Sequence, residues 1–180
     1  MAMVAVKVEG VGLDSNHGPV VVLREADGDR FLPIWIGHTE AAAIQIKLDG
    51  QDYLRPLTHD LIQSIIQTLN SKLVRVDINA LKDSTYFAQL TIVNGNGEEV
   101  KIDARPSDSI AMALRANADI YVEESLFRMS TAENELQPPG SDQSDPHESE
   151  EDHAERKRQE LRRRLRDIDP GDFGSFKLGG

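Results

Sequence analysis

The sequence contains no cysteine, which removes several kinds of site at once. Disulfides, thiolate zinc sites, iron–sulfur clusters and cysteine nucleophiles are all excluded. The fold must therefore depend on an ordinary hydrophobic core. A domain of about 130 residues can build one, because it buries roughly two thirds of the surface of its unfolded chain. The absence of cysteine fits a reducing compartment, and we expect a cytoplasmic protein.

Long apolar runs and common cofactor motifs are also missing. No segment approaches the ~18 apolar residues of a membrane span, and the start of the chain lacks a basic segment followed by a long apolar one. We therefore expect no membrane partner. The motifs G-x-x-x-x-G-K-S/T, G-x-G-x-x-G after a strand, and G-x-S-x-G are absent. We expect neither a nucleotide nor a redox cofactor.

Basic residues are fewer than acidic ones in residues 1–130, the part of the chain whose composition is typical of a folded domain. The formal net charge is −11, and residues 1–130 carry 18 acidic and 12 basic side chains. Passive nucleic-acid binders usually present a basic field, because their affinity comes largely from displaced counterions. If this part of the chain binds nucleic acid, a few well-placed arginines or a metal ion must offset its negative field.

Composition changes abruptly after Met129 and predicts four segments. Residues 1–130 form the domain. Residues 131–153 carry eight acids and no base, and predict a disordered linker. In residues 154–169, Leu161, Leu165 and Ile168 predict a short amphipathic helix, whose seven bases suit an acidic partner. Residues 170–180 are expected to be a flexible C-terminus.

Within the domain, periodicity predicts seven strands and three helices. The strands are expected at residues 4–8, 19–23, 31–36, 73–81, 86–93, 98–104 and 120–122, and the helices at 39–49, from 58, and at 107–117. Thr39, Thr58 and Ser107 are the expected N-terminal caps. Because the strands come in clusters of three, we predict an α+β fold with a mixed, largely antiparallel sheet. Pro33 should lie on an edge strand or at a bulge.

The helix that begins at Thr58 has the clearest pattern. Five large aliphatic residues form one stripe, which is typical of a helix that packs against other apolar groups. These residues are Leu61, Ile62, Ile65, Ile66 and Leu69.

Two helices start in nearly the same way, with an arginine, a proline, a hydroxyl residue and an acid. The residues are Arg55, Pro56, Thr58 and Asp60 in the first segment, and Arg105, Pro106, Ser107 and Asp108 in the second. A cationic fork beside the N–H groups of a first helical turn suits a phosphate. The other interpretation is that each arginine pairs with a nearby carboxylate and fixes a loop.

Two further groups could carry chemistry. Glu99, Lys101 and Asp103 alternate along one predicted strand, as carboxylates and a lysine do in many metal-dependent nucleases, with Asp77 or Asp83 as the upstream acid. A solvent-facing charged strand would look the same. His59 with Asp60 could be a general base with an orienting acid, or part of a metal site, or a structural histidine near a helix cap.

Four separated stretches carry a resemblance to a known family. "FLPIWIGHTEAAAI", "RPLTHDL", "STYFAQL" and "IDARPSDSIAMALR", in this order, make residues 1–130 resemble the bifunctional nuclease domain family. The resemblance implies a compact, often oligomeric α+β domain, found in proteins credited with degrading both DNA and RNA. Residues 131–180 lie outside it.

We therefore predict a nuclease that hydrolyses phosphodiester bonds of DNA or RNA with Mg²⁺ or Mn²⁺. The resemblance also implies a homo-oligomer. The candidate catalytic residues are His59, Asp60, Asp103 and Asp108. The candidate phosphate-binding residues are Arg55, Thr58, Arg105 and Ser107, and the candidate metal ligands are Asp60, Asp103, Asp108 and Glu99. This prediction requires Arg55, Arg105, Asp103 and Asp108 to meet in one cleft. The alternative is a non-catalytic oligomeric adaptor or ligand-sensing domain whose basic helix binds a partner.

Overall fold

The structure is a computed structural model that describes residues 2–14, 18–51 and 53–128. The chain divides into two units, Met1–Ala132 and Glu133–Gly180, and every described residue lies in the first. The predicted linker, basic helix and C-terminus therefore lie outside the described residues.

The α+β prediction is confirmed. The strands are β1 (Met3–Asp14), β2 (Gly18–Glu25), β3 (Phe31–Trp35), β4 (Lys72–Lys82), β5 (Thr85–Val93), β6 (Glu99–Ala104) and β7 (Asp119–Glu123). The main helices are α1 (His38–Leu48), α2 (Thr58–Thr68) and α3 (Pro106–Ala116), and residues 124–128 add a short helix. No described helix has the length and apolar character needed to cross a membrane.

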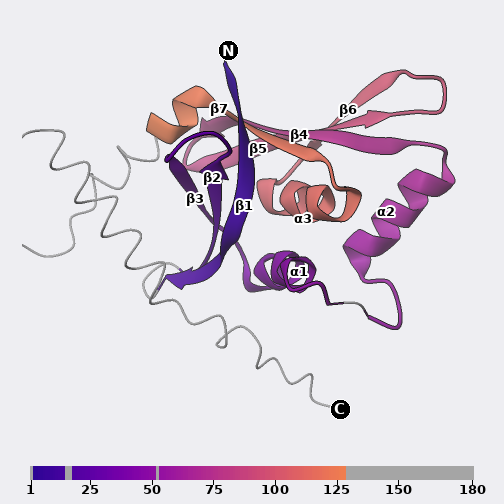
Figure 1. The fold of residues 1–180 in the computed structure, drawn as a ribbon, viewed down its shortest axis with the longest axis horizontal. Coiled ribbons are helices and arrows are strands. Elements are labelled where there is room, and N and C mark those ends of the chain that lie inside the picture. Colours follow the sequence, from indigo (N-terminus) through magenta and orange to yellow (C-terminus); the bar gives the residue numbers. More distant parts are fainter. Residues whose placement is uncertain (1, 15–17, 52, 129–180) are drawn as a thin grey trace, which may run out of the picture. The chain divides into compact units, whose positions relative to one another are not determined.

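One sheet contains all seven strands, in the order β3-β2-β1-β7-β4-β5-β6. Neighbours are antiparallel except for β4 and β7, which are parallel. The last strand in the chain is thus central, with Ile120 opposite Val6 on one side and Val76 on the other. β7 joins two antiparallel units, β1–β3 and β4–β6, that are each consecutive in sequence (Figure 1).

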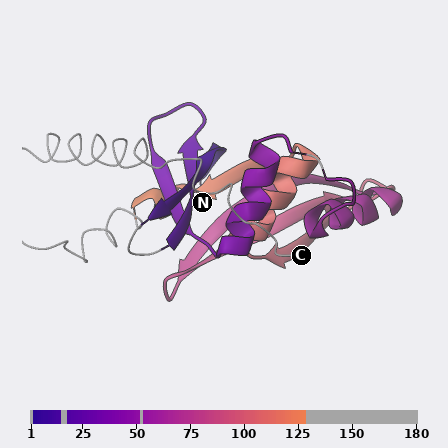
Figure 2. The ribbon, with the colours of Figure 1, turned by 90° about the horizontal axis from the view of Figure 1, so that it is seen from below.

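The core lies between the sheet and α3, which packs against α1, α2, β4 and β5. In both orientations α1 lies beside α3 on the same side of the sheet (Figures 1 and 2). Ile110 and Met112 of α3 are buried, as are Ile44 of α1 and Ile78 of β4. This packing fixes the start of α3 relative to the other helices.

One prediction about the backbone is confirmed, and the end of α1 follows from residue type. Pro33 lies on β3, which is an edge strand of the sheet, so its missing N–H interrupts no central ladder. Gly50 follows α1 with φ +64°, the left-handed conformation that glycine adopts without strain.

The predicted hydroxyl caps are wrong. The cap positions of the three helices are Gly37, Leu57 and Arg105, and none makes a side-chain cap hydrogen bond. Pro106 takes the first position of α3, where its missing N–H costs nothing, so the helix starts one residue before Ser107. In α2, the side chain of Asp60 instead accepts the backbone N–H of Leu57 at 3.0 Å.

The apolar stripe of α2 does not face the core. No residue of α2 is buried, although Ile66 packs partly against the core. The other members of the stripe, Leu61, Ile62, Ile65 and Leu69, are exposed.

Candidate functional site

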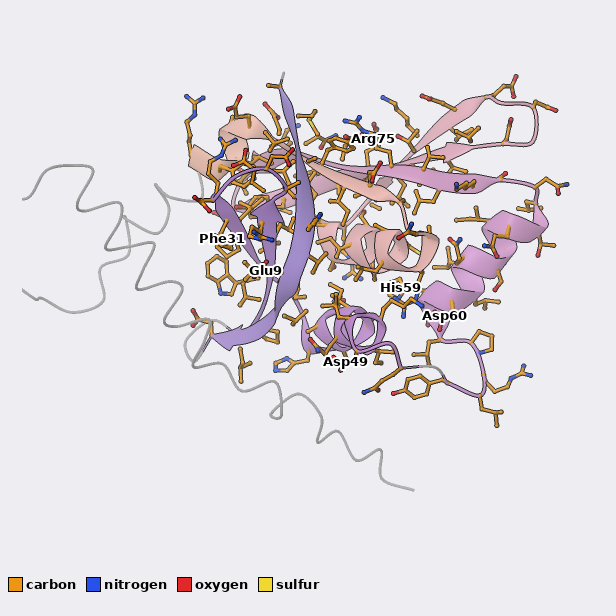
Figure 3. All side chains as sticks on the ribbon, in the orientation of Figure 1. Glu9, Phe31, Asp49, His59, Asp60 and Arg75 are labelled. Carbon is orange, nitrogen blue, oxygen red and sulfur yellow. The ribbon has the colours of Figure 1, made fainter. Side chains whose placement is uncertain are left out.

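The first turns of α1, α2 and α3 meet at a cluster of four charged or titratable side chains. Arg105 Nε donates to Asp108 Oδ2 at 2.7 Å, and its Nη1 lies 3.0 Å from Glu40 Oε1. His59 Nε2 lies 3.2 Å from the other oxygen of Asp108. Figure 3 shows the His59 side chain between α2 and the neighbouring helices. We call Glu40, His59, Arg105 and Asp108 the helix-start cluster.

Burial differs sharply within this cluster. The side chain of Arg105 is 66% exposed, whereas His59 and Glu40 are mostly covered. Both oxygens of Asp108 are engaged, one by each neighbour. The cluster therefore presents one accessible guanidinium over a histidine–carboxylate pair that the protein holds in place.

Electrostatics keep Asp108 ionised. Burial raises the pKa of Asp108, but hydrogen bonds from Arg105 and His59 outweigh that effect and hold the pKa below its ordinary value. The hydrogen bond to Asp108 in turn raises the pKa of Arg105, and Glu40 adds to this. Near neutral pH, Asp108 is an anion that accepts hydrogen bonds.

An open cavity of about 270 Å³ borders the cluster. The end of β3, the start of α1, the β4–β5 turn and the start of α3 line it, and Trp35, Tyr86 and Arg105 are among its residues. Ser107 also lines it and is only 6% exposed, yet its hydroxyl has no hydrogen-bond partner among the described residues. A polar group so placed is available to a ligand that enters the cavity.

A second ion pair lies deeper and was missed in the sequence. Arg115, at the end of α3, is 3% exposed, and its Nε donates to Asp60 Oδ1 at 2.6 Å. Its Nη1 donates to the carbonyl oxygens of Ala43 at 3.1 Å and Ala111 at 3.0 Å. Arg115 thus ties α1, α2 and α3 together. No local spacing could have signalled this pair, because its members are 55 residues apart.

Asp60 is committed to this clamp. Burial raises the pKa of Asp60, but hydrogen bonds from Arg115 and from the Leu57 backbone outweigh that effect. The pKa of Asp60 therefore lies below its ordinary value. The prediction that each arginine pairs with a nearby carboxylate therefore holds for Arg105, which pairs with Asp108. It does not hold for Arg55 among the described residues, because Asp60 pairs with Arg115 instead.

Several candidate residues lie apart from the cluster. Arg55 and Thr58 are exposed, and Arg55 forms no hydrogen bond or ion pair with the described part of the chain. Glu99 and Asp103 are exposed on β6, again without an ion pair to a described residue. Arg105 thus pairs with Asp108. Neither of these two residues pairs with Arg55 or with Asp103.

The described residues contain no group of three or more His, Asp or Glu side chains arranged to hold a metal ion. The described residues of one chain thus do not bring together the four predicted metal ligands, which are Asp60, Asp103, Asp108 and Glu99. Their role as ligands stays a prediction. Asp77 is paired with Arg75, and Asp83 lies in the β4–β5 turn with φ +48°.

Comparison with known proteins matches residues 21–135 to the model of the bifunctional nuclease domain. The chain belongs to the bifunctional nuclease domain family. The matched range includes all three main helices and therefore the whole helix-start cluster.

Relatives of two kinds are similar to this chain. An uncharacterized protein of Mycobacterium tuberculosis is 40% identical over 169 residues, which cover 93% of this chain and 96% of that protein. Bifunctional nuclease 2 of Oryza sativa subsp. japonica is 30% identical over 63% of this chain and 36% of its own length. Bifunctional nuclease 1 of Arabidopsis thaliana is 28% identical over 60% of this chain and 34% of its own length. The alignment thus spans about a third of each plant protein.

Proposed function

We propose that this chain is a nuclease that hydrolyses phosphodiester bonds of DNA, RNA or both at the helix-start cluster. Family membership and the names of the plant relatives support the reaction class. The observation that carries the choice of site is the accessible guanidinium of Arg105 beside the His59–Asp108 pair. Arg105 can reach a phosphate in solvent while the pair behind it handles a proton.

Each residue of the cluster has a chemical role in this proposal. The Asp108 carboxylate accepts a hydrogen bond from the N–H of His59 Nε2, and this tautomer leaves the lone pair on Nδ1. That nitrogen has no hydrogen-bond partner among the described residues and takes the proton of the attacking water. Arg105 neutralises charge on the phosphate, and the hydroxyl of Ser107 donates to a phosphate oxygen at the start of α3.

We retain Mg²⁺ or Mn²⁺ in the proposal as an ion shared with the substrate. Magnesium is commonly held by one or two carboxylates together with substrate phosphates, and does not require a full set of protein ligands. Glu40 and Asp108 supply carboxylate oxygens of the right kind, although both now bond Arg105. The ion would add charge neutralisation at the phosphate.

The test is cleavage of labelled single- and double-stranded DNA and RNA by the full chain with Mg²⁺, with Mn²⁺ and with EDTA. We expect His59→Gln to lower the rate by roughly 10²- to 10⁴-fold, as for loss of a general base. Arg105→Gln should lower it as well. The matched control is Arg24→Gln, which removes an exposed arginine paired with Glu9 on a different part of the sheet. Thermal unfolding of each variant checks that the fold is intact.

Two results would contradict the proposal in different ways. Full activity in folded His59→Gln and Arg105→Gln variants would remove this site. An inactive parent under every condition would remove the reaction, and would favour the non-catalytic adaptor or ligand-sensing domain. For that function we propose an acidic partner for residues 154–169, which a Leu161→Asp variant in the full chain would fail to capture.

A further inference from the structure

One large aromatic side chain is exposed at the cavity that borders the helix-start cluster. Trp35 is the last residue of β3, is 40% exposed and lines this cavity together with Tyr86 and Arg105. It is also the only tryptophan in the chain. Tryptophan has a large, flat apolar surface, so the exposed part of the ring can contact a ligand that enters the cavity.

The backbone holds Trp35 in a fixed position relative to Arg105. The residue after Trp35, Ile36, donates its N–H to the carbonyl oxygen of Pro19 in β2 at 2.9 Å. Helix α1 begins two residues later, and Glu40 Oε1 in its first turn lies 3.0 Å from Arg105 Nη1. The aromatic ring and the guanidinium are thus mounted on regular elements, which position a ligand more precisely than loops do.

The cavity combines two kinds of surface that match the two ends of a nucleotide. Trp35 and Tyr86 contribute aromatic rings. Arg105 contributes a guanidinium on a side chain that is 66% exposed, and Ser107 contributes a hydroxyl. A nucleotide has a flat aromatic base joined to a charged phosphate. The rings suit the base, and the guanidinium and the hydroxyl suit the phosphate.

Charge alone does not account for nucleic-acid binding at this cavity. Among the described residues that line it, Arg105 and Glu40 are the only charged ones, and they pair with each other. Residues 1–130 carry 18 acids and 12 bases. The affinity that comes from displaced counterions is therefore small, and an uncharged contact such as base stacking has to add to it.

The size of the cavity favours an unpaired base. Its volume of about 270 Å³ lies near the lower end of the ~300–1,000 Å³ range of small-molecule sites. It has room for one base and not for a base pair with its neighbours. A base inside a duplex also has both faces covered by the bases above and below, so it must leave the stack before it can contact a side chain with its face.

We propose that Trp35 makes this site selective for single-stranded nucleic acid, because an unpaired base stacks on its indole ring while the adjacent phosphate contacts Arg105. This inference rests on the proposed function and names its substrate class. Every base has a π face, so the contact selects for strandedness and not for sequence. Trp35 touches the substrate without moving a proton, so its role is to determine specificity.

The first test uses Trp35 itself as the probe, since the tryptophan fluorescence of the full chain comes from this position alone. The full chain carrying His59→Gln, in which cleavage is slowed, is titrated in Mg²⁺ with oligothymidylate and separately with oligouridylate. We expect saturable quenching, and the tighter of the two ligands shows whether DNA or RNA is preferred. An abasic strand of equal length has the same phosphates and no bases, so it should quench far less, as should a fully paired duplex. No quenching by either single strand, or equal quenching by the abasic strand or the duplex, would overturn the proposal.

The second test measures cleavage by folded variants of the full chain. Trp35→Leu should lower the ratio of single-strand to duplex cleavage about 5- to 150-fold, the loss expected for one stacked base, and Trp35→Phe should retain most of that ratio. The matched control is Tyr53→Leu, which removes an aromatic side chain that is 53% exposed and lines a different cavity. Equal losses on both substrates in Trp35→Leu would overturn the proposal. Cleavage without quenching would remove this inference alone, whereas quenching without cleavage would remove the proposed reaction and leave the base contact.

Discussion

Replacement of Arg115 by methionine tests whether one buried guanidinium holds the three helices together. Methionine keeps most of the aliphatic stem of arginine, so packing changes little while the charged group is removed. The change removes the ion pair with Asp60 and the two hydrogen bonds to the carbonyl oxygens of Ala43 and Ala111.

The expected cost follows from those contacts. A hydrogen bond to a charged group contributes about 1.5–3 kcal/mol, and we take the lower end for the Asp60 pair because solvent screens part of it. The carboxyl side chain of Asp60 is 37% exposed, whereas Arg115 is 3% exposed. The two bonds to carbonyl oxygens contribute about 1 kcal/mol each. The total is about 3.5 kcal/mol, which for a domain of this size lowers Tm by about 10 °C.

Thermal unfolding of the full chain, followed by circular dichroism, measures this loss. The matched control is Arg55→Met, which changes an exposed arginine that bonds no described residue and should shift Tm by less than about 2 °C. Equal shifts in the two variants would refute the reasoning, because the structure would then have assigned the clamp to the wrong arginine.

Two further predictions concern stability. The folded-state pKa values of Asp60 and Asp108 lie below the ordinary 3.8, so the stability they contribute is complete above that value and is lost as the pH falls through the lowered values. The urea concentration at the unfolding midpoint should therefore stay constant from pH 7 to about pH 5 and decrease at lower pH. Asp108→Asn should make this decrease with pH shallower. The same pH dependence in Asp108→Asn and the parent would contradict the assigned pairs. Gln63→Leu removes a buried oxygen without a partner, so it should raise the free energy of unfolding by about 1 kcal/mol in urea titration, and a loss of stability would show that the oxygen is satisfied after all.

Local patterns in the sequence were sufficient for the elements and for the class of fold. Alternation and short apolar runs predicted a strand at each of the seven positions, alternation as in β5 (Thr85–Val93), and Pro33 lies on an edge strand, one of the two places predicted for it. The central position of β7 could not be predicted, because a five-residue strand carries no signal for which neighbours it will pair with. Two helix caps were mispredicted: Thr58 and Ser107 are good caps by residue type, but the caps are Leu57, one residue before Thr58, and Arg105, two residues before Ser107.

The α2 stripe shows where periodicity stops being informative. The pattern correctly predicted an amphipathic helix, since α2 spans Thr58–Thr68 with its aliphatic residues on one side. Periodicity says that such a side must be covered, but it does not say by what. In the described part of the chain, α2 packs mainly against α3, Ile66 packs partly against the core, and Ile65 and Leu69 remain exposed. A pattern that predicts core within one chain can equally predict an interface between two.

The two Arg-Pro helix starts are alike in sequence but not in structure, and the difference comes from a third arginine. At the start of α3, Asp108 accepts a hydrogen bond from Arg105 and also contacts His59. At the start of α2, Asp60 is already bound by Arg115, which reaches it from the last turn of α3. Arg55 is thus left exposed without a carboxylate partner among the described residues. The position of one buried cation therefore decides which of two similar segments forms the candidate site and which forms the entry to an exposed helix.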